Sequence, residues 1–363
     1  MRHMISRDDI EMIGLGASLL GTGGGGNVHL GRLKLRRILE QGRTVEVIDI
    51  GEVPPDAIGI GFSGMGAPTI DVEKIPNGFE GERAVHAVEQ AGGYHFRFLV
   101  VGEIGGSNAL EALHVGAMTG LPVVDADPMG RAFPELQMDT FMIHGITPCP
   151  LGLADAHGTT AVLNAIESPY RAEHYARALT VAMGGSAALA FPVVTGEQVR
   201  QYAVHGSLSL AHYLGRLMTR HRNLTTLIDG LREKFDVSLL AEGKIVDVER
   251  RTMAGFARGQ VTLSGPGGPY TILLQNEFLA LLAKDRVLAS VPDLITVVDH
   301  DTGLPISTDQ LRYGMRVGVL GIPAPESLKS ERALAFVGPA AFDYPFAYDP
   351  LPGRYPKAPW FED

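Results

Sequence analysis

The spacing of apolar residues along the first half of the chain predicts helices and strands in alternation. Apolar side chains at Ile10, Ile13, Ala17 and Leu20 recur at helical spacing behind Ser6, a residue type that commonly caps helices. The same pattern predicts further helices over 30–40, 80–90 and 108–119, and strands over 44–50, 57–62, 96–101 and 121–124. A strand, a helix and a strand in this order form a βαβ unit, so its parallel strands end at one edge of a sheet.

The second half of the chain has a different pattern. It predicts two or three antiparallel strands over 138–166, helices over 170–183 and 206–234, and short strands over 237–319. The apolar stretch 178–194 is shorter than the roughly 20 residues of a membrane helix, and glycines interrupt it. We therefore predict a mixed α/β protein: an N-terminal α/β domain over 1–168 with a βαβ parallel-sheet unit, and a β-rich α+β domain over 169–363. Its proline-rich tail is expected to lie over the body or over a neighbouring subunit of a homo-oligomer.

Composition and charge narrow the class of partner. The hydrophobic share of 45% is that of a globular protein, and a formal charge of −10 argues against nucleic acid or an anionic membrane surface. The first residues lack the features of a secretory signal, and the single cysteine, Cys149, fits a reducing compartment. We therefore expect a cytoplasmic protein that acts on a small molecule, with Cys149 as a buried thiol.

A run of glycines over 20–27 is the first candidate site. Its backbone N–H groups open the helix over 30–40, where an anion or a carbonyl oxygen is favourably bound, so Thr22 and Gly23, Gly24, Gly25 and Gly26 are predicted to bind substrate. The run also fits the GxGxxG dinucleotide fingerprint, but a helix precedes it where that fingerprint requires a strand. The alternative is a tight turn between two helices that binds nothing.

Acidic residues at strand ends form the second candidate site. Glu103 follows one predicted parallel strand, and Asp125 and Asp127 follow the next, so the three carboxylates are expected to converge at one sheet edge. Paired carboxylates suit proton transfer, or Asp125 and Asp127 could hold a divalent metal. Arg131 could neutralise these acids or bind a substrate carboxylate. Ser107 and Asn108 lie at the start of the next predicted helix and are also predicted to bind substrate. The alternative is that Asp125 and Asp127 cap turns and that Arg131 pairs with them.

Weaker candidates lie elsewhere. The loop over 63–74 follows another strand and could bring Thr69 or Glu73 to the same edge, although either fits a turn equally well. His300, between two aspartates, is a possible metal ligand, but a turn between strands explains it better. The chain has no GxSxG elbow, which argues against a serine hydrolase of that type.

Several segments resemble signature segments of the S-methyl thiohydantoin desulfurase family, long regarded as a domain of unknown function. They are LGTGGGG at 20–26, GMGAPT at 64–69, GEIGGSNAL at 102–110 and VDADPMGRAFPELQM at 124–138, with a weaker likeness at 183–194. The resemblance implies an N-terminal domain that bears the site, a β-rich C-terminal domain, and hydrolytic replacement of sulfur on a hydantoin-like ring.

The resemblance suggests roles for the candidate residues. Amides of the glycine run would bind a ring carbonyl, Asp125 or Asp127 would activate water directly or through a metal such as zinc, and Arg131 would hold a substrate carboxylate. Because such proteins are often encoded beside hydantoinase or oxoprolinase proteins, a hydantoinase-type partner is a second expectation. Two alternatives stay open: a non-catalytic accessory or ligand-binding subunit of such an enzyme, and a nucleotide-binding enzyme.

Overall fold

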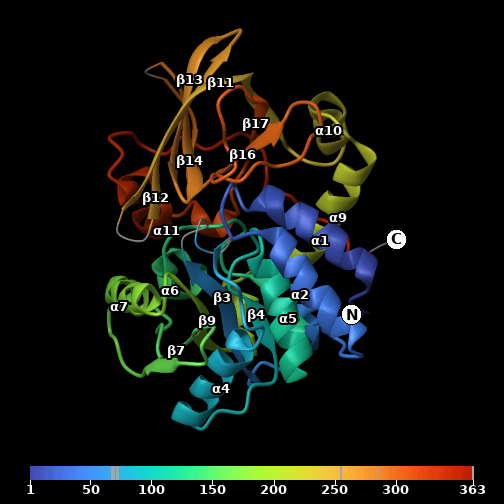
Figure 1. Cartoon of the computed structure of the whole chain (residues 1–363), viewed down its shortest axis with the longest axis vertical. Helices are drawn as coiled ribbons and strands as arrows, with labels where there is room; N and C mark the ends of the chain where they lie inside the picture. Colours follow the sequence, from blue (N-terminus) through green and yellow to red (C-terminus); the bar gives the residue numbers. More distant parts are fainter. Residues whose placement is uncertain (67–69, 71–72, 254–255, 285, 362–363) are drawn as a thin grey trace.

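The computed structural model describes residues 1–66, 70, 73–253, 256–284 and 286–361, and for residues 252 and 253 the backbone alone. The chain forms an α/β body, which lies below in Figure 1, and a body of antiparallel strands above it. The predicted mixed α/β class with a second, β-rich part is confirmed. The predicted domain boundary near residue 168 stays a prediction. Two elements beyond it, strand β9 (Ser186–Thr195) and helix α9 (Ser207–Arg220), still pack within the α/β body.

An eight-stranded mixed sheet forms the centre of the α/β body, in the order β1-β2-β5-β4-β3-β9-β7-β8. The pairs β2·β5, β5·β4 and β4·β3 are parallel, as the predicted βαβ unit requires, and the other pairs are antiparallel. The strands besides β9 are β1 (Arg2–Met4), β2 (Glu46–Ile48), β3 (Ile58–Gly66), β4 (Leu99–Val101), β5 (Val123–Val124), β7 (Leu151–Ala154) and β8 (Thr160–Leu163). The carboxyl ends of β3, β4 and β5 therefore meet at one edge.

Helices cover this sheet largely where the apolar spacing predicts them. Ser6 caps α1 through a reciprocal capping box with Asp9, because its hydroxyl accepts the Asp9 N–H while the Asp9 carboxylate accepts the Ser6 N–H. The buried face of α1 packs against α9 (Figure 1). The bounds are α1 (Arg7–Leu20), α2 (Val28–Glu40), α4 (Glu80–Gly92), α5 (Asn108–Thr119), α7 (Pro169–Ala182), α8 (Gly196–Tyr202) and α10 (Leu224–Arg232).

The segment 138–166 departs in part from the predicted strands. Its end forms the antiparallel pair β7·β8, but its beginning forms the short helix α6 (Thr140–Ile143) behind the 3₁₀ turn η2 (Leu136–Met138). The carboxylate of Asp139 accepts the backbone N–H of Met142 at 2.7 Å. This cap stabilises a helical turn, and alternation of apolar residues alone does not reveal it.

The second body is a seven-stranded antiparallel sheet in the order β15-β14-β13-β12-β11-β17-β16. Its strands are β11 (Ser238–Met253), β12 (Phe256–Gly265), β13 (Gly268–Gln275), β14 (Glu277–Ala283), β15 (Arg286–Ser290), β16 (Leu294–Asp299) and β17 (Arg316–Ile322). A two-stranded pair links the halves of the chain, because β6 (Ala126–Asp127) pairs with β10 (Val204–His205).

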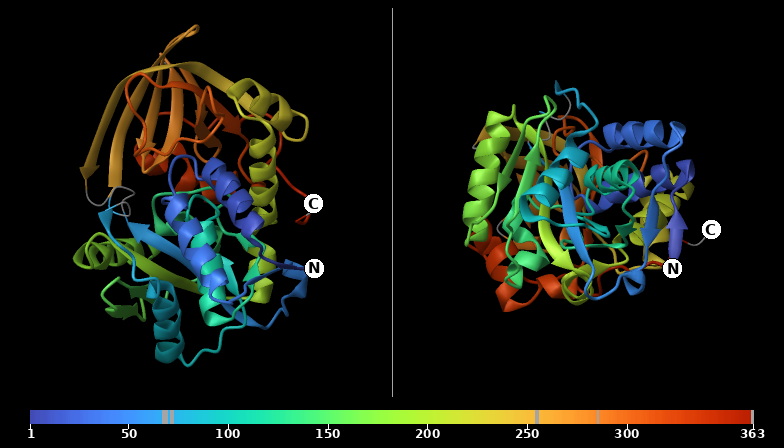
Figure 2. Two further views of the ribbon diagram at one scale, coloured as in Figure 1. Left: turned by 45° about the vertical axis from the view of Figure 1, so that its right-hand side comes forward. Right: turned by 90° about the horizontal axis from the view of Figure 1, so that it is seen from below.

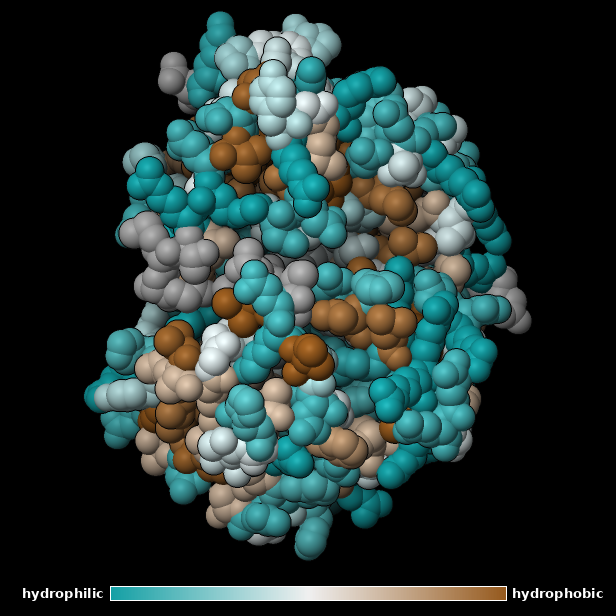
Figure 3. Space-filling model, in the orientation of Figure 1, coloured by the Kyte–Doolittle hydropathy of each residue, from teal (hydrophilic) through white to brown (hydrophobic). Residues whose placement is uncertain are grey.

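The C-terminal segment runs back over both bodies after η3 (Glu326–Leu328), α11 (Glu331–Val337) and η4 (Pro339–Phe342). The Tyr355 hydroxyl donates to the Gly130 carbonyl at 2.8 Å, and the Phe361 ring stacks on His3. The two chain ends consequently lie on the same side of the molecule (Figure 2). Hydrophilic residues cover much of the face in Figure 3, with apolar residues in small groups among them. Each described helix is too short or too polar to span a bilayer.

Candidate functional site

A cavity of about 190 Å³ lies at the junction of the two bodies. Its walls come from the end of β3, the turn after β4, the first turns of α5, the glycine run and the start of β14. It thus occupies the carboxyl edge of the parallel strands, where ligands of open α/β sheets bind. Its charged lining residues are Lys34, Lys74, Glu80, Glu103, Glu111, Glu135, Arg177 and Glu277.

Glu103 lies in the wall of this cavity and is 8% exposed. One carboxylate oxygen accepts a short hydrogen bond from the Asn108 side-chain amide, and the other accepts the Phe133 N–H at 3.2 Å. The Asn108 side-chain oxygen in turn accepts the Gly64 N–H at 2.8 Å, which fixes the amide orientation. Burial raises the pKa of Glu103 to about 8, although these donors favour its ionised form. Glu103 can therefore exchange a proton near neutral pH.

Glu277 faces the same cavity from the β-rich body and is 3% exposed. It follows Asn276, whose φ of 55° lies in the left-handed region at the turn from β13 to β14. Oxygen Oε2 of Glu277 is buried and has no hydrogen-bond partner among the described residues. Burial, and next the negative charge of Glu103, raise the pKa of Glu277 well above its ordinary value. Glu103 and Glu277 thus form a pair of interacting acids, one from each body.

Other polar residues complete the cavity wall. Lys34 from α2 forms an ion pair with Glu111 of α5, and the Lys74 ammonium donates to the carbonyls of Met183 and Ser186 at 2.8 and 2.7 Å. Arg177 of α7 binds Glu173 at 2.7 Å. Lys34, Lys74 and Arg177, the described cations of the lining, each bind another part of the protein, so these side chains stabilise the cavity wall.

Arg131 and Thr22 do not line this cavity, although the sequence predicts both as substrate-binding residues. Arg131 is fully buried beneath it and donates to the Thr22 hydroxyl at 2.8 Å and to the carbonyls of Ala132, Phe278 and Asp293 at 2.9, 3.0 and 2.6 Å. Because its nitrogens already donate to the protein, the expected grip on a substrate carboxylate has no support in the geometry. Arg131 instead connects the glycine run to the β-rich body.

Asp125 and Asp127 do not line the cavity, although the negative charge of Asp127 acts on Glu103. Asp125 accepts the backbone N–H groups of Leu208 and Ser209 at 2.7 and 3.1 Å and the Ser209 hydroxyl at 2.5 Å, at the start of α9. Asp127 accepts the N–H groups of Ile104, Met129 and Gly130. Both carboxylates accept backbone donors, as the capping alternative expects, although Oδ1 of Asp127 has no hydrogen-bond partner among the described residues. The catalytic role of Asp125 and Asp127 stays a prediction.

This placement makes a prediction for Asp125→Ala. Three donors at the start of α9 lose their acceptor, so we expect the free energy of unfolding to fall by about 1–3 kcal/mol. Turnover per folded molecule should stay within about threefold of the unaltered protein, because no reacting group is removed. Chemical denaturation and turnover at a temperature where both proteins are folded measure the two effects. A loss of turnover without a loss of stability would return Asp125 to the list of catalytic candidates.

The glycine run has a packing role that the predicted amide site does not include. A Cβ on Gly25 would lie 2.2 Å from the Gly105 carbonyl oxygen, and one on Gly24 would lie 1.9 Å from Oε1 of Glu277. Gly25 and Gly26 line the cavity, whereas Gly23 and Gly24 line a separate hollow on the other side of the run. The run lies between helices α1 and α2, so the strand required by the dinucleotide fingerprint does not precede it.

The carbonyl groups of the glycine run contribute to the site indirectly. Those of Gly25 and Gly26 accept the N–H groups of Asn108 and Ser107 at 3.3 Å each. These bonds position the start of α5, where Ser107 and Asn108 line the cavity as predicted for substrate-binding residues. Whether any of them binds substrate stays a prediction.

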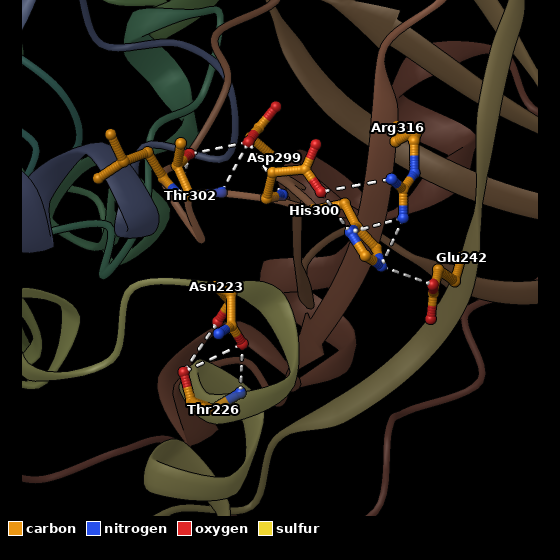
Figure 4. Close-up of polar contacts among 9 residues, drawn as sticks. Asn223, Thr226, Glu242, Asp299, His300, Thr302 and Arg316 are labelled. Atoms are coloured by element: carbon orange, nitrogen blue, oxygen red, sulfur yellow. Dashed lines mark hydrogen bonds and ion pairs between the residues drawn. The ribbon is translucent and has the colours of Figure 1, made fainter.

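The remaining candidates are distributed as follows. Thr69 lies outside the described residues, and Glu73 is exposed and absent from the cavity lining. His300 lies in the turn between β16 and β17, where it contacts Asp301 at 2.9 Å and Glu242 at 3.1 Å (Figure 4). Asp299 accepts two backbone N–H groups of the same turn. Among the described residues, no group of three or more His, Cys, Asp or Glu side chains could hold a metal ion.

Several cavity residues were missed from the sequence, Glu277 and His114 among them. Glu277 is an isolated acid in the apolar segment ILLQNEFLALLA, and a buried acid in such a context is a signal for function. His114 follows Asn108 and Glu111 at helical spacing along α5, on the face that continues the site. Neither signal identifies the cavity from the sequence alone, because residues of both bodies line it.

Fold and cavity together define a two-body α/β protein with a polar cavity between the bodies. Family models match most of the chain: the S-Me-THD-like N-terminal domain over residues 8–165 and the S-Me-THD-like C-terminal domain over residues 167–351. The chain belongs to the S-Me-THD-like family, which confirms the resemblance to S-methyl thiohydantoin desulfurases.

A solved structure supports the same fold. The chain is similar to a protein from Chromobacterium violaceum whose X-ray crystal structure is known, with 26% sequence identity and a TM-score of 0.79. The similarity covers 96% of this chain and 99% of that one, so it extends over both bodies. No curated protein matches the chain.

Proposed function

We propose that this protein is a hydrolase of a hydantoin-like small molecule that carries sulfur on its ring, with Glu103 and Glu277 as the catalytic pair. The observation that carries the proposal is that these two acids reach one cavity from different bodies, each with a raised pKa. Titratable groups with perturbed pKa values in a cleft are typical of catalytic sites. Membership of the S-Me-THD-like family supports a hydantoin-related substrate.

The surroundings of the two acids assign their roles. Glu103 accepts hydrogen bonds from Asn108 and Phe133, which favour its ionised form, whereas the charge of Arg131 acts on both acids, so Glu103 ionises before its partner. Glu277 has a buried oxygen without a hydrogen-bond partner among the described residues, and a negative charge on Glu103 makes the ionisation of Glu277 still less favourable. Glu103 then serves as the general base and Glu277 as the general acid.

The proposed reaction balances with water as the only co-substrate. Ionised Glu103 takes a proton from water while the water oxygen bonds to the ring carbon that carries sulfur. The carbon–sulfur bond breaks, and Glu277 gives its proton to the departing sulfur, which leaves as a thiol. The hydroxyl left on the ring carbon tautomerises to a carbonyl and an adjacent N–H. The proton gained by Glu103 returns to Glu277, which restores the pair.

The pKa of Glu103 predicts how the rate depends on pH. A general base acts only when ionised, so kcat/KM should rise about tenfold per pH unit below pH 8 and level off above it, because the pKa of Glu103 is about 8. Measuring kcat/KM for an S-methyl thiohydantoin between pH 6 and pH 9 checks this. A rate that is constant or falls as pH increases through this range would contradict the assignment of Glu103 as the base.

The purified protein can be tested directly by incubation with an S-methyl thiohydantoin and measurement of released methanethiol. Release by the protein alone, above the rate of a heat-inactivated sample, supports the proposal. Release only after addition of a hydantoinase-type protein would favour the accessory-subunit alternative instead. The absence of release under both conditions would reject the proposed activity for this substrate.

A further inference from the structure

His114 is a buried polar residue for which the proposed reaction has no role. It is 7% exposed, lines the cavity, and has no hydrogen-bond partner for its ring among the described residues. Neighbouring polar groups of the same wall differ in this respect: Glu111 binds Lys34, and Asn108 binds Glu103. An imidazole in a cavity wall whose ring has no partner in the described protein is free to bind a ligand through its donor and its acceptor.

The position of His114 separates it from the acid pair. It lies six residues after Asn108 on helix α5, which corresponds to a rise of about 9 Å along the helix axis. Asn108, Glu111 and His114 all line the cavity, so the cavity follows this face of α5 from the acids towards the imidazole. A five-membered ring that reacts at Glu103 therefore leaves room for a ring substituent directed at His114.

The charge around His114 indicates what kind of substituent fits there. Lys34 is already paired with Glu111, and Glu80 adds a further negative charge nearby. Burial, and next the charge of Lys34, lower the pKa of His114 to about 4 against the opposing charges of Glu111 and Glu80, so its ring is neutral at physiological pH. A neutral imidazole offers one donor and one acceptor, which complement an amide or a hydroxyl group. An anionic group would find no unpaired cation among the described residues of this part of the wall.

We propose that His114 is a specificity-determining residue that hydrogen-bonds an uncharged polar substituent, such as a carboxamide, on the ring of the substrate. This inference rests on the proposed function for the position of the ring, whereas the binding preference at His114 can be measured without any turnover. It adds a recognition subsite to a site whose acids act on the ring itself.

The test uses three S-methyl thiohydantoins whose side chains at ring carbon 5 have equal length and end in a carboxamide, an isopropyl group or a carboxylate. Dissociation constants are measured by calorimetry with the full chain carrying Glu103→Gln, in which the proposed turnover is blocked. We expect the carboxamide to bind about tenfold more tightly than the isopropyl compound, because one buried imidazole gains its partners. The carboxylate should bind more weakly than the carboxamide.

Two further substitutions separate recognition from packing. His114→Gln keeps a donor and an acceptor, whereas His114→Met has nearly the same shape as glutamine and lacks both. The preference for the carboxamide should persist in His114→Gln and fall to within about twofold in His114→Met. Equal preferences in these two variants, tighter binding of the carboxylate, or no binding of any of the three compounds would overturn the inference. If the protein prefers the carboxamide compound but the unaltered protein turns over none of the three compounds, the proposed function is rejected and the binding role of His114 is retained.

Discussion

Replacement of Glu103 by glutamine is expected to lower kcat about 100- to 10,000-fold for an S-methyl thiohydantoin, which is the usual contribution of a general base. Glutamine has nearly the shape of glutamate but cannot take a proton from water. The loss should appear in kcat, and the residual rate of the variant should not depend on pH between 6 and 9, because the group that titrates near pH 8 is gone. Initial rates of thiol release across this pH range measure both effects.

Asp139→Asn provides the matched control for this experiment. Asp139 is also a buried acid whose pKa is raised by burial, to about 7, but it caps α6 and does not line the cavity. Asparagine retains the acceptor oxygen for the Met142 N–H, so the helix cap persists. Turnover per folded molecule should stay within about threefold. Similar losses of turnover per folded molecule in Glu103→Gln and Asp139→Asn would show a general effect of altering a buried acid and would contradict a specific role of Glu103 as the base.

The part of the site near Glu103 is predictable from the sequence because it is local. Glu103, Ser107 and Asn108 lie within one turn that connects β4 to α5, so strand and helix patterns alone place them at the carboxyl edge of the sheet. The same reasoning places Asp125 and Asp127 near this edge, but it cannot tell which way their side chains point. The start of α9, far along the chain, supplies the donors that hold Asp125.

The remainder of the site depends on contacts between distant parts of the chain. Glu277 reaches the cavity because the turn before β14 packs on the glycine run, where the Phe278 N–H donates to the Thr22 carbonyl at 2.8 Å. No periodicity in either segment predicts this pairing. The glycines themselves are informative, since Gly24 leaves room for the Glu277 carboxylate, but sequence alone does not show whether a ligand or another part of the protein fills that room.

Replacement of Arg131 by methionine is expected to lower the free energy of unfolding by about 3–5 kcal/mol, the usual cost of removing one partner from a buried charged network. The change leaves the carbonyls of Phe278 and Asp293 without the donors that the guanidinium supplies. It also removes the positive charge that offsets Glu277, Asp293 and Glu103. Urea denaturation followed by circular dichroism measures the loss.

Arg316→Met makes the same chemical change on the surface and serves as the control. The Arg316 side chain is 60% exposed and pairs with Asp301 at 3.5 Å, so its loss should cost less than about 1 kcal/mol. The loss in free energy of unfolding for Arg131→Lys should lie between those of Arg131→Met and Arg316→Met. Lysine keeps the charge but cannot reproduce the several directed hydrogen bonds of the guanidinium. If Arg131→Met destabilises the protein no more than Arg316→Met, the buried arginine does not connect the two bodies. The cavity between them would then owe its shape to apolar packing alone.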